Sequence, residues 1–188
     1  MRELIKITLL IAMLLFCLIA CETQSSVQQY YVTAKEQPAF VSMDLPASLL
    51  NPEASTLSGE TQQILSTIHK VNFLALPVSS ATEAFYQTEK GKVSELLSQA
   101  AYKQLFRMQT ENTGGSVYYV GTEVAVDELI LFGYKDGQGF VLIRLLGDGM
   151  NPAKILSVMD SLDMDMKALP VQEFKDIFEQ VGFGDKEA

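Results

Sequence analysis

The second half of the chain changes from helical spacing to an alternation of apolar and polar residues, and this change constrains the fold most. Four runs are expected to be strands: residues 105–110, 117–120, 126–134 and 139–146. Residues 112–115 and 135–138 contain the glycines that are typical of hairpin turns. Short turns join only antiparallel neighbours, because parallel strands need long crossovers. The sequence therefore predicts a four-strand antiparallel meander.

Further elements around the meander complete the prediction. In chain order they are a strand at 39–45, a helix at 58–69, a strand at 71–78, a helix from the capping box at 80–83, a helix after Asn151-Pro152 and a helix at 171–182. The second strand has a nearly unbroken apolar run, which favours burial on both faces. The predicted fold is α+β, an antiparallel sheet with a four-strand meander and helices packed on one face.

The N-terminal residues have the pattern of a bacterial lipoprotein signal. Arg2 and Lys6 precede an uncharged apolar run at 7–18, and a small residue precedes Cys21. Lipoprotein processing needs a cysteine after the cut, because its thiol takes a diacylglycerol. An ordinary signal peptide or an N-terminal membrane helix is the alternative, but a span needs roughly 20 apolar residues. We expect residues 1–20 to be a lipoprotein signal peptide and Cys21 to be lipidated.

The rest of the chain is predicted to be a tether followed by one domain. Polar residues 21–37 are expected to be flexible, and residues 38–185 to form a single α+β domain. Cys17 leaves with the signal and Cys21 carries lipid, so the folded part has no thiol for a disulfide, a nucleophile or a metal site. No cofactor or metal is expected.

The chain is acidic, with a formal net charge of −9. An acidic chain without a basic run does not attract phosphate backbones, so nucleic-acid binding is not expected. It also gains nothing from an anionic bilayer surface, so membrane attachment depends on the acyl chains of Cys21. Residues 22–26 contain a single acidic residue, and a surface-export signal would need a cluster of them. We expect a lipid-anchored protein of the cell envelope, on the periplasmic face of the outer membrane.

Several segments of the expected core resemble a known family. They are residues 38–42, 71–76, 102–108, 127–131 and 139–147. Together they are similar to small lipoproteins of Bacteroidota that are grouped as domain of unknown function 4252. The similarity covers roughly residues 38–165 and consists mostly of core strands. The resemblance implies an envelope lipoprotein with no assigned activity and no known catalytic residues.

Arg144 interrupts an otherwise apolar strand. If Asp136-Gly137 form the turn, Leu129 lies opposite Arg144, and Asp127 lies diagonally from it on the same face. Long side chains reach across such a diagonal. We therefore expect a salt bridge between Arg144 and Asp127 that helps to fix the strand register. The alternative is a ligand-facing arginine that holds a carboxylate.

Tyr118 and Tyr119 are adjacent in a predicted strand, so their rings point to opposite faces of the sheet. One ring is expected to pack in the core, and the other to form part of a partner or sugar surface near Arg107. Together with Arg144 and Asp127, these three residues are the possible binding residues of the chain.

Three other features have a simpler structural interpretation beside a functional one. Residues 147–152 join a strand to a helix as phosphate loops do, but they contain a carboxylate and no lysine follows, which favours a capped turn. Asp160, Asp163 and Asp165 are possible calcium ligands, but they lack the glycine of an EF-hand loop, which favours a solvated acidic end. His69 has no serine motif or second metal ligand nearby and is expected near a helix C-terminus.

These observations predict a non-enzymatic envelope lipoprotein that binds another envelope protein or senses the state of the envelope. A small-ligand or lipid carrier is the first alternative. It needs an underpacked pocket among Phe73, Phe85, Leu96, Leu131 and Leu142. A carboxylate-based hydrolase is the second, and it needs two acids with perturbed pKa values that converge in a cleft.

Overall fold

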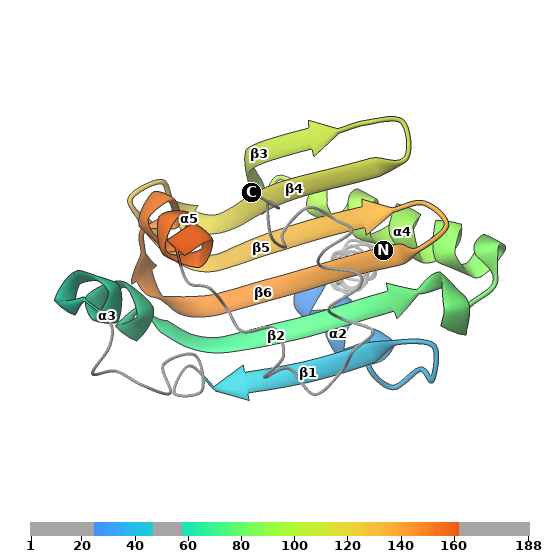
Figure 1. Ribbon diagram of the computed structural model, residues 1–188, viewed down its shortest axis with the longest axis horizontal. Coiled ribbons are helices and arrows are strands. Elements are labelled where there is room, and N and C mark those ends of the chain that lie inside the picture. Colours follow the sequence, from blue (N-terminus) through green and yellow to red (C-terminus); the bar gives the residue numbers. More distant parts are fainter. Residues whose placement is uncertain (1–24, 47–57, 162–188) are drawn as a thin grey trace, which may run out of the picture.

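The computed structural model describes residues 25–46 and 58–161 (Figure 1). The strands are β1 (Val41–Pro46), β2 (Ile68–Pro77), β3 (Lys103–Gln109), β4 (Thr113–Thr122), β5 (Ala125–Lys135) and β6 (Gly139–Met150). The helices are α2 (Val27–Ala34), α3 (Gly59–Ser66), α4 (Glu83–Leu97) and α5 (Pro152–Ser161), with a short 3₁₀ helix, η2 (Val78–Ser80).

The predicted α+β class and the predicted meander are confirmed, but the sheet is larger. Strands β3, β4, β5 and β6 pair in succession, and every pairing is antiparallel. Strand β2 pairs with the other side of β6, and β1 pairs with β2. The sheet therefore has six strands in the order β1-β2-β6-β5-β4-β3, with β1 and β3 at its edges.

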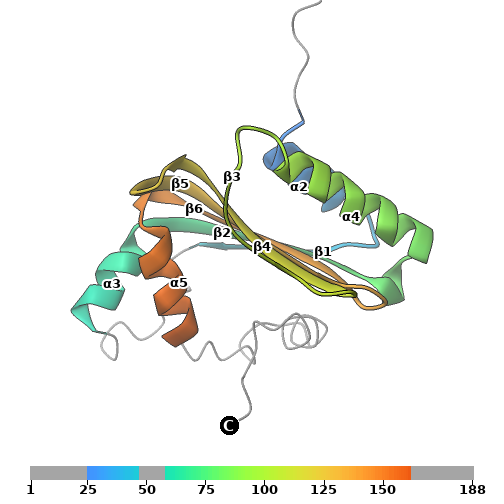
Figure 2. The same ribbon diagram turned by 90° about the horizontal axis from the view of Figure 1, so that it is seen from above.

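Helices lie on both faces of this sheet, so the prediction of helices on one face is wrong. Figure 2 shows α2 and α4 on one face and α3 and α5 on the other. The inner strands are apolar on both sides. In β5, for example, Leu129 and Leu131 belong to the core under α3 and α5, whereas Ile130 and Phe132 belong to the core under α2 and α4. A sheet that is apolar on both faces is stable in water only when both are covered.

Helix α2 lies within residues 21–37, the segment predicted to be a flexible tether, so that prediction is wrong for residues 27–34. The Ser26 side chain caps the helix by accepting a backbone N–H at 3.1 Å. Val27, Tyr31 and Ala34 recur at helical spacing and are buried. The few apolar residues of this polar segment are therefore one face of a packed helix, and the domain begins well before residue 38.

The sheet divides the core into two parts, which bears on the predicted carrier pocket. Of the five residues named for it, Phe73 and Leu131 belong to the core under α3 and α5. Leu96 and Leu142 are in the core under α2 and α4, and Phe85 packs against that core. Residues on opposite faces of a sheet cannot line one pocket.

Several helix boundaries differ from the sequence prediction. Helix α3 ends at Ser66 and β2 begins at Ile68, so His69 lies in a strand and not at a helix end. Helix α4 is capped by Thr82, whose hydroxyl accepts from the backbone N–H of Phe85 at 3.3 Å, and not by Ser80. No helix in the described part of the chain is long and apolar enough to cross a membrane.

The glycine-containing segment at 147–152 continues β6 as far as Met150 and then begins α5. The Asn151 side chain accepts from the backbone N–H of Lys154 at 3.1 Å, which confirms the predicted cap. A Cβ at Gly147 would lie 2.0 Å from the carbonyl oxygen of Thr67. Close backbone approach explains glycine at this position without a phosphate. Cys21, Asp163, Asp165 and the predicted helix at 171–182 lie outside the described residues.

Candidate functional site

A groove of about 290 Å³ opens between α4 and the sheet, on the face that α2 also covers. We call it the α4 groove. Its lining comes from α4, from the turn that follows it and from strands β3, β4 and β5, and it includes Lys90, Tyr102, Arg107, Tyr118 and Tyr134. The groove therefore brings together aromatic and cationic side chains from parts of the chain that are distant in sequence.

The charge of the α4 groove is opposite to that of the chain. The sequence has 23 acidic and 14 basic residues. The groove lining contains Lys90 and Arg107 and, within the described ranges, no carboxylate. A concave surface of one sign of charge concentrates ligands of the opposite sign. The α4 groove is therefore suited to an anionic group.

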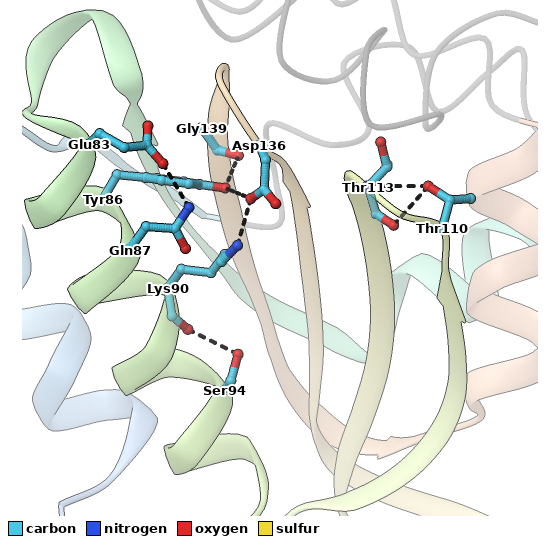
Figure 3. A network of polar contacts seen from close by, with 9 residues as sticks. All are labelled: Glu83, Tyr86, Gln87, Lys90, Ser94, Thr110, Thr113, Asp136 and Gly139. Atoms are coloured by element: carbon cyan, nitrogen blue, oxygen red, sulfur yellow. Dashed lines mark hydrogen bonds and ion pairs between the residues drawn. The ribbon is translucent and has the colours of Figure 1, made fainter.

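Lys90 is held in place by the β5–β6 hairpin (Figure 3). Its Nζ donates to Oδ1 of Asp136 at 2.5 Å, and it lies 4.7 Å from the ring centre of Tyr134. The Tyr86 hydroxyl donates to the same carboxylate oxygen at 3.0 Å. The positive charge of Lys90 is therefore matched within the protein, and this residue forms a fixed wall of the groove.

These contacts shift the pKa values of Tyr86 and Asp136 in opposite directions. Burial and the neighbouring Asp136 carboxylate raise the pKa of the Tyr86 hydroxyl. Burial alone would raise the pKa of Asp136, but the hydrogen bonds from Lys90 and Tyr86 outweigh it and hold the pKa below its ordinary value. Asp136 therefore stays ionised and joins α4 to the hairpin.

Arg107 is the cation of the groove that keeps its charge available. It is exposed, and its Nη2 donates to Oε1 of Gln109 at 2.9 Å on the same strand. Among the described residues no carboxylate lies within 4 Å of its guanidinium. It pairs in register with Ser116, next to Tyr118. An exposed guanidinium with free donors can hold a carboxylate through two parallel hydrogen bonds.

Strand β3, which carries Arg107, is itself unusually exposed. It lies at one edge of the sheet, and all of its residues are exposed. Leu105, Phe106 and Met108 are 44%, 52% and 48% exposed. Edge strands with apolar side chains are places where another chain can pair, and most proteins protect such edges. Strand β3 and the α4 groove thus form one continuous candidate site.

Arg144 lies elsewhere, in a buried row of polar residues that crosses the sheet beneath α2. Its Nε donates to Oε1 of Glu128 at 2.6 Å, and its Nη1 donates to Oδ1 of Asn72 at 3.3 Å. The same Nη1 donates to Oε1 of Gln28 on α2. With three acceptors from the protein, the guanidinium fits the register-fixing role better than a role in ligand binding.

The acidic partner of Arg144 is Glu128. The sequence-based prediction of Asp127 is therefore wrong. The hairpin loop has three residues, because Lys135 pairs with Gly139. This one-residue shift places Ile130 opposite Arg144 and makes Glu128 its diagonal neighbour. Asp127 is exposed and lies at the irregularity of the strand between Val126 and Glu128.

The row of polar residues continues from buried Asn72 to exposed Asp44 on the edge strand β1. Asn72 pairs in register with Asp44 and donates to its carboxylate. The Tyr31 hydroxyl of α2 donates to Oδ1 of Asp44 at 2.9 Å. Burial raises the pKa of Asp44, but the hydrogen bonds from Tyr31 and Asn72 and the charge of Lys70 outweigh it, so this pKa lies below its ordinary value. The row therefore binds α2 to the sheet through polar contacts as well as apolar ones.

The two adjacent tyrosines point to opposite faces, as predicted, but both are buried. Tyr118 belongs to the core under α2 and α4 and lines the α4 groove. Tyr119 belongs to the opposite core, and Nζ of Lys103 lies 5.7 Å from its ring centre. The structure therefore brings Tyr118 and Arg107 to one site, and it leaves Tyr119, Arg144 and Asp127 out of that site.

The described residues do not bring together two acids with shifted pKa values, as the hydrolase alternative requires. Asp44 and Asp136 have lowered pKa values, but they belong to separate networks, one with Tyr31 and one with Tyr86. His69 is exposed, 3.6 Å from the Asp148 carboxylate. Within the part of the chain that the structure describes, no three histidine, cysteine or acidic side chains gather to hold a metal ion.

The fold and the site together define an α+β protein with a six-stranded antiparallel sheet, helices on both faces, an apolar edge strand and a cationic groove beside it. The chain belongs to the family described as a domain of unknown function, DUF4252, whose model matches residues 30–158. The matched range begins inside α2 and ends inside α5, so it spans the whole sheet. Comparisons with curated proteins and with solved structures found no match.

Proposed function

We propose that this chain is a non-enzymatic lipoprotein of the bacterial cell envelope that binds another envelope protein. The observation that carries the proposal is the exposed edge strand β3, where Leu105, Phe106 and Met108 present apolar side chains to solvent. Contiguous apolar exposure beside polar residues is typical of protein interaction sites. Interaction surfaces are also enriched in methionine, aromatic residues and arginine, all of which occur here.

The proposed anchor explains how such a module reaches its partner. Acyl chains on Cys21 would hold the domain at the membrane, on the periplasmic face of the outer membrane. Confinement to a surface raises the effective concentration of the domain for a partner on the same surface. A modest contact area along one strand then suffices for binding.

Site-specific crosslinking in cells tests the proposal. A photoreactive amino acid replaces Phe106 in the full-length chain, and a matched chain carries it at exposed Ser66 on α3, far from β3. We expect a defined crosslinked protein from position 106 that is absent from position 66 and lost when Cys21→Ser removes the anchor. Equal crosslinking from both positions, or none from position 106, would contradict the proposal.

The α4 groove gives specific support to the carrier alternative. Its volume of about 290 Å³ is at the small end of ligand pockets. Native mass spectrometry of the purified full-length chain distinguishes the two functions. A carrier would show a bound small molecule that Arg107→Glu removes, together with no site-selective crosslink at position 106. An interaction module would show the crosslink without the small molecule.

A further inference from the structure

We propose that strand β3 pairs with an extended segment of the partner in which acidic and apolar residues alternate, so that the segment adds a seventh strand to the sheet. This inference rests on the proposed interaction function and specifies how the partner binds. It follows from three properties of β3: the direction of its backbone groups, the side chains on its two faces, and its charge.

The backbone of β3 has groups available for a further strand. The N–H of Thr110 donates to the carbonyl of Thr113 at 2.8 Å, which makes this a hydrogen-bonded pair at the end of the hairpin. Hydrogen-bonded and non-hydrogen-bonded pairs alternate along an antiparallel ladder. The N–H and C=O of Gln109 and Arg107 therefore point away from β4, and in the described chain β4 is the only strand paired with β3. Strand addition uses such outward-pointing groups.

The two faces of β3 present different chemistry. Arg107 pairs with Ser116, on the face of the α4 groove. Phe106 pairs with Val117, which belongs to the core of the opposite face, and Met108 lies two residues further on that same side. Side chains of an added strand also alternate between faces. A residue opposite Arg107 would therefore reach its guanidinium, while the residues on either side would contact Phe106 and Met108.

The charge of β3 specifies which polar residue alternates with the apolar ones. The strand contains Lys103 and Arg107 and no acidic residue. A glutamate or aspartate opposite Arg107 would pair with its free guanidinium.

A second copy of this chain fits the same edge poorly. Strand β3 contains no acidic residue, so the β3 strand of a second copy would offer no carboxylate to Arg107. The occupant that the strand favours is therefore a different protein with an acidic, alternating segment.

Two synthetic peptides serve as probes of strand addition. Both have flexible glycine-serine ends and a fluorophore, and the central segment alternates valine with glutamate in one and valine with lysine in the other. The full-length chain in detergent micelles should bind the glutamate peptide about tenfold more tightly, as expected for one additional charge-assisted pair. Arg107→Glu should reverse this preference. Lys154→Glu makes the same charge change on α5, where the side chain is exposed, and should leave the preference unchanged.

Amide hydrogen exchange followed by NMR tests the backbone pairing itself. Bound glutamate peptide should protect the amides of Arg107 and Gln109, and it should leave Met108, which lies in a hydrogen-bonded pair with β4, little changed. A preference that Arg107→Glu does not reverse, or protection away from β3, would overturn the inference. If position 106 crosslinks to a partner but neither peptide binds, strand addition is wrong and the interaction function stands. If the glutamate peptide binds and no partner crosslinks, the proposed function is wrong and the binding mode stands.

Discussion

The Arg144 guanidinium and the Glu128 carboxylate meet at 2.6 Å on the face of the sheet that α2 covers. Arg144 is 3% exposed, so its charge depends on this partner and on the amide oxygens of Asn72 and Gln28. Glu128 and Arg144 come from adjacent strands, whereas Gln28 comes from α2. One buried cation therefore connects the centre of the sheet to α2.

Removing Arg144 should destabilise the domain strongly. Arg144→Ala is expected to lower the free energy of unfolding by about 3 kcal/mol, because Glu128 loses its partner in a poorly solvated place. Asp127→Asn, at the neighbouring exposed position, should change it by less than about 0.5 kcal/mol. Urea denaturation of both variants measures the two values.

A double variant separates the charge effect from the packing effect. Arg144→Met combined with Glu128→Leu should recover much of the stability that Arg144→Ala loses, because no unpaired charge is then left near the core. Equal effects of Arg144→Ala and Asp127→Asn would contradict the structural role of the Arg144–Glu128 pair.

Helix α2 should behave as part of the folded domain. Tyr31→Ala removes a buried ring that packs on the sheet and donates to Asp44, and it should cost about 3 kcal/mol of stability, as large-to-small core changes do. Val32→Ala, one residue further and 40% exposed, should cost less than about 0.5 kcal/mol. Thermal unfolding monitored by circular dichroism tests the contrast, which would vanish if α2 were detached in solution.

Asp136 should make the stability depend on pH in the acid range. Its lowered pKa means that the folded state favours the ionised carboxylate, so its stabilisation is present above the ordinary carboxyl pKa and is lost as the pH falls through the lower folded value. Asp136→Asn should cost about 1.5–3 kcal/mol at pH 7, the usual range for a hydrogen bond to a charged group.

This difference between wild type and variant should shrink below about pH 4, where an ordinary carboxyl group is half protonated. Denaturation series from pH 7 to pH 3 give the measurement. Asp148→Asn is the control, because Asp148 is largely exposed and its carboxylate pairs, among the described residues, with exposed His69. A constant difference between wild type and Asp136→Asn across this range would rule out the assigned ionisation.

Two glycines should respond oppositely to alanine. Gly147→Ala places a methyl group 2.0 Å from the backbone oxygen of Thr67 and should cost about 1–3 kcal/mol through overpacking. Gly91→Ala meets nothing within 4 Å in the middle of α4 and should stabilise the protein by about 0.5–1 kcal/mol. Melting temperatures that move in the same direction would contradict the close approach of Thr67 to Gly147.

The meander and the start of α5 could be predicted because their signals are local. Period-two alternation, the Asp136-Gly137 turn and the Asn151 cap each depend on residues close together in the chain. The register of the β5–β6 pair could not be predicted, since a loop of three residues instead of two exchanges Asp127 for Glu128 as the neighbour of Arg144. A shift of one residue reverses every side chain between faces.

The arrangement of the helices on the two faces of the sheet could not be predicted from the sequence, for a different reason. Strands β2, β5 and β6 are apolar on both sides, and such runs show that both faces are buried without showing which helix covers which face. Helix α2 is short and mostly polar, so its three buried residues give a weak periodic signal.

About half of the candidate site could be anticipated. Tyr118 and Arg107 were expected near one another because they lie on neighbouring strands. Lys90 and Tyr134 reach the same groove from α4 and from the end of β5, and no motif links these positions in sequence. The exposure of β3 was not visible either, because an edge strand and an inner strand can have the same composition.

If Cys21 is lipidated as we propose, the packing of α2 limits how far the domain can move from the membrane. If all of residues 21–37 were an extended linker, the domain could lie up to about 60 Å from its anchor, since an extended chain spans up to about 3.5 Å per residue. Because α2 packs on the sheet from Val27 onward, a linker that begins at an anchored Cys21 could span only about 20 Å. The backbone N–H of Val27 donates to the hydroxyl of Tyr102 at 2.9 Å, and Tyr102 lines the α4 groove. Such a linker would therefore join the domain beside the groove. A protein anchored in this way would search a thin layer above the lipid surface, with the groove end of the domain held toward it.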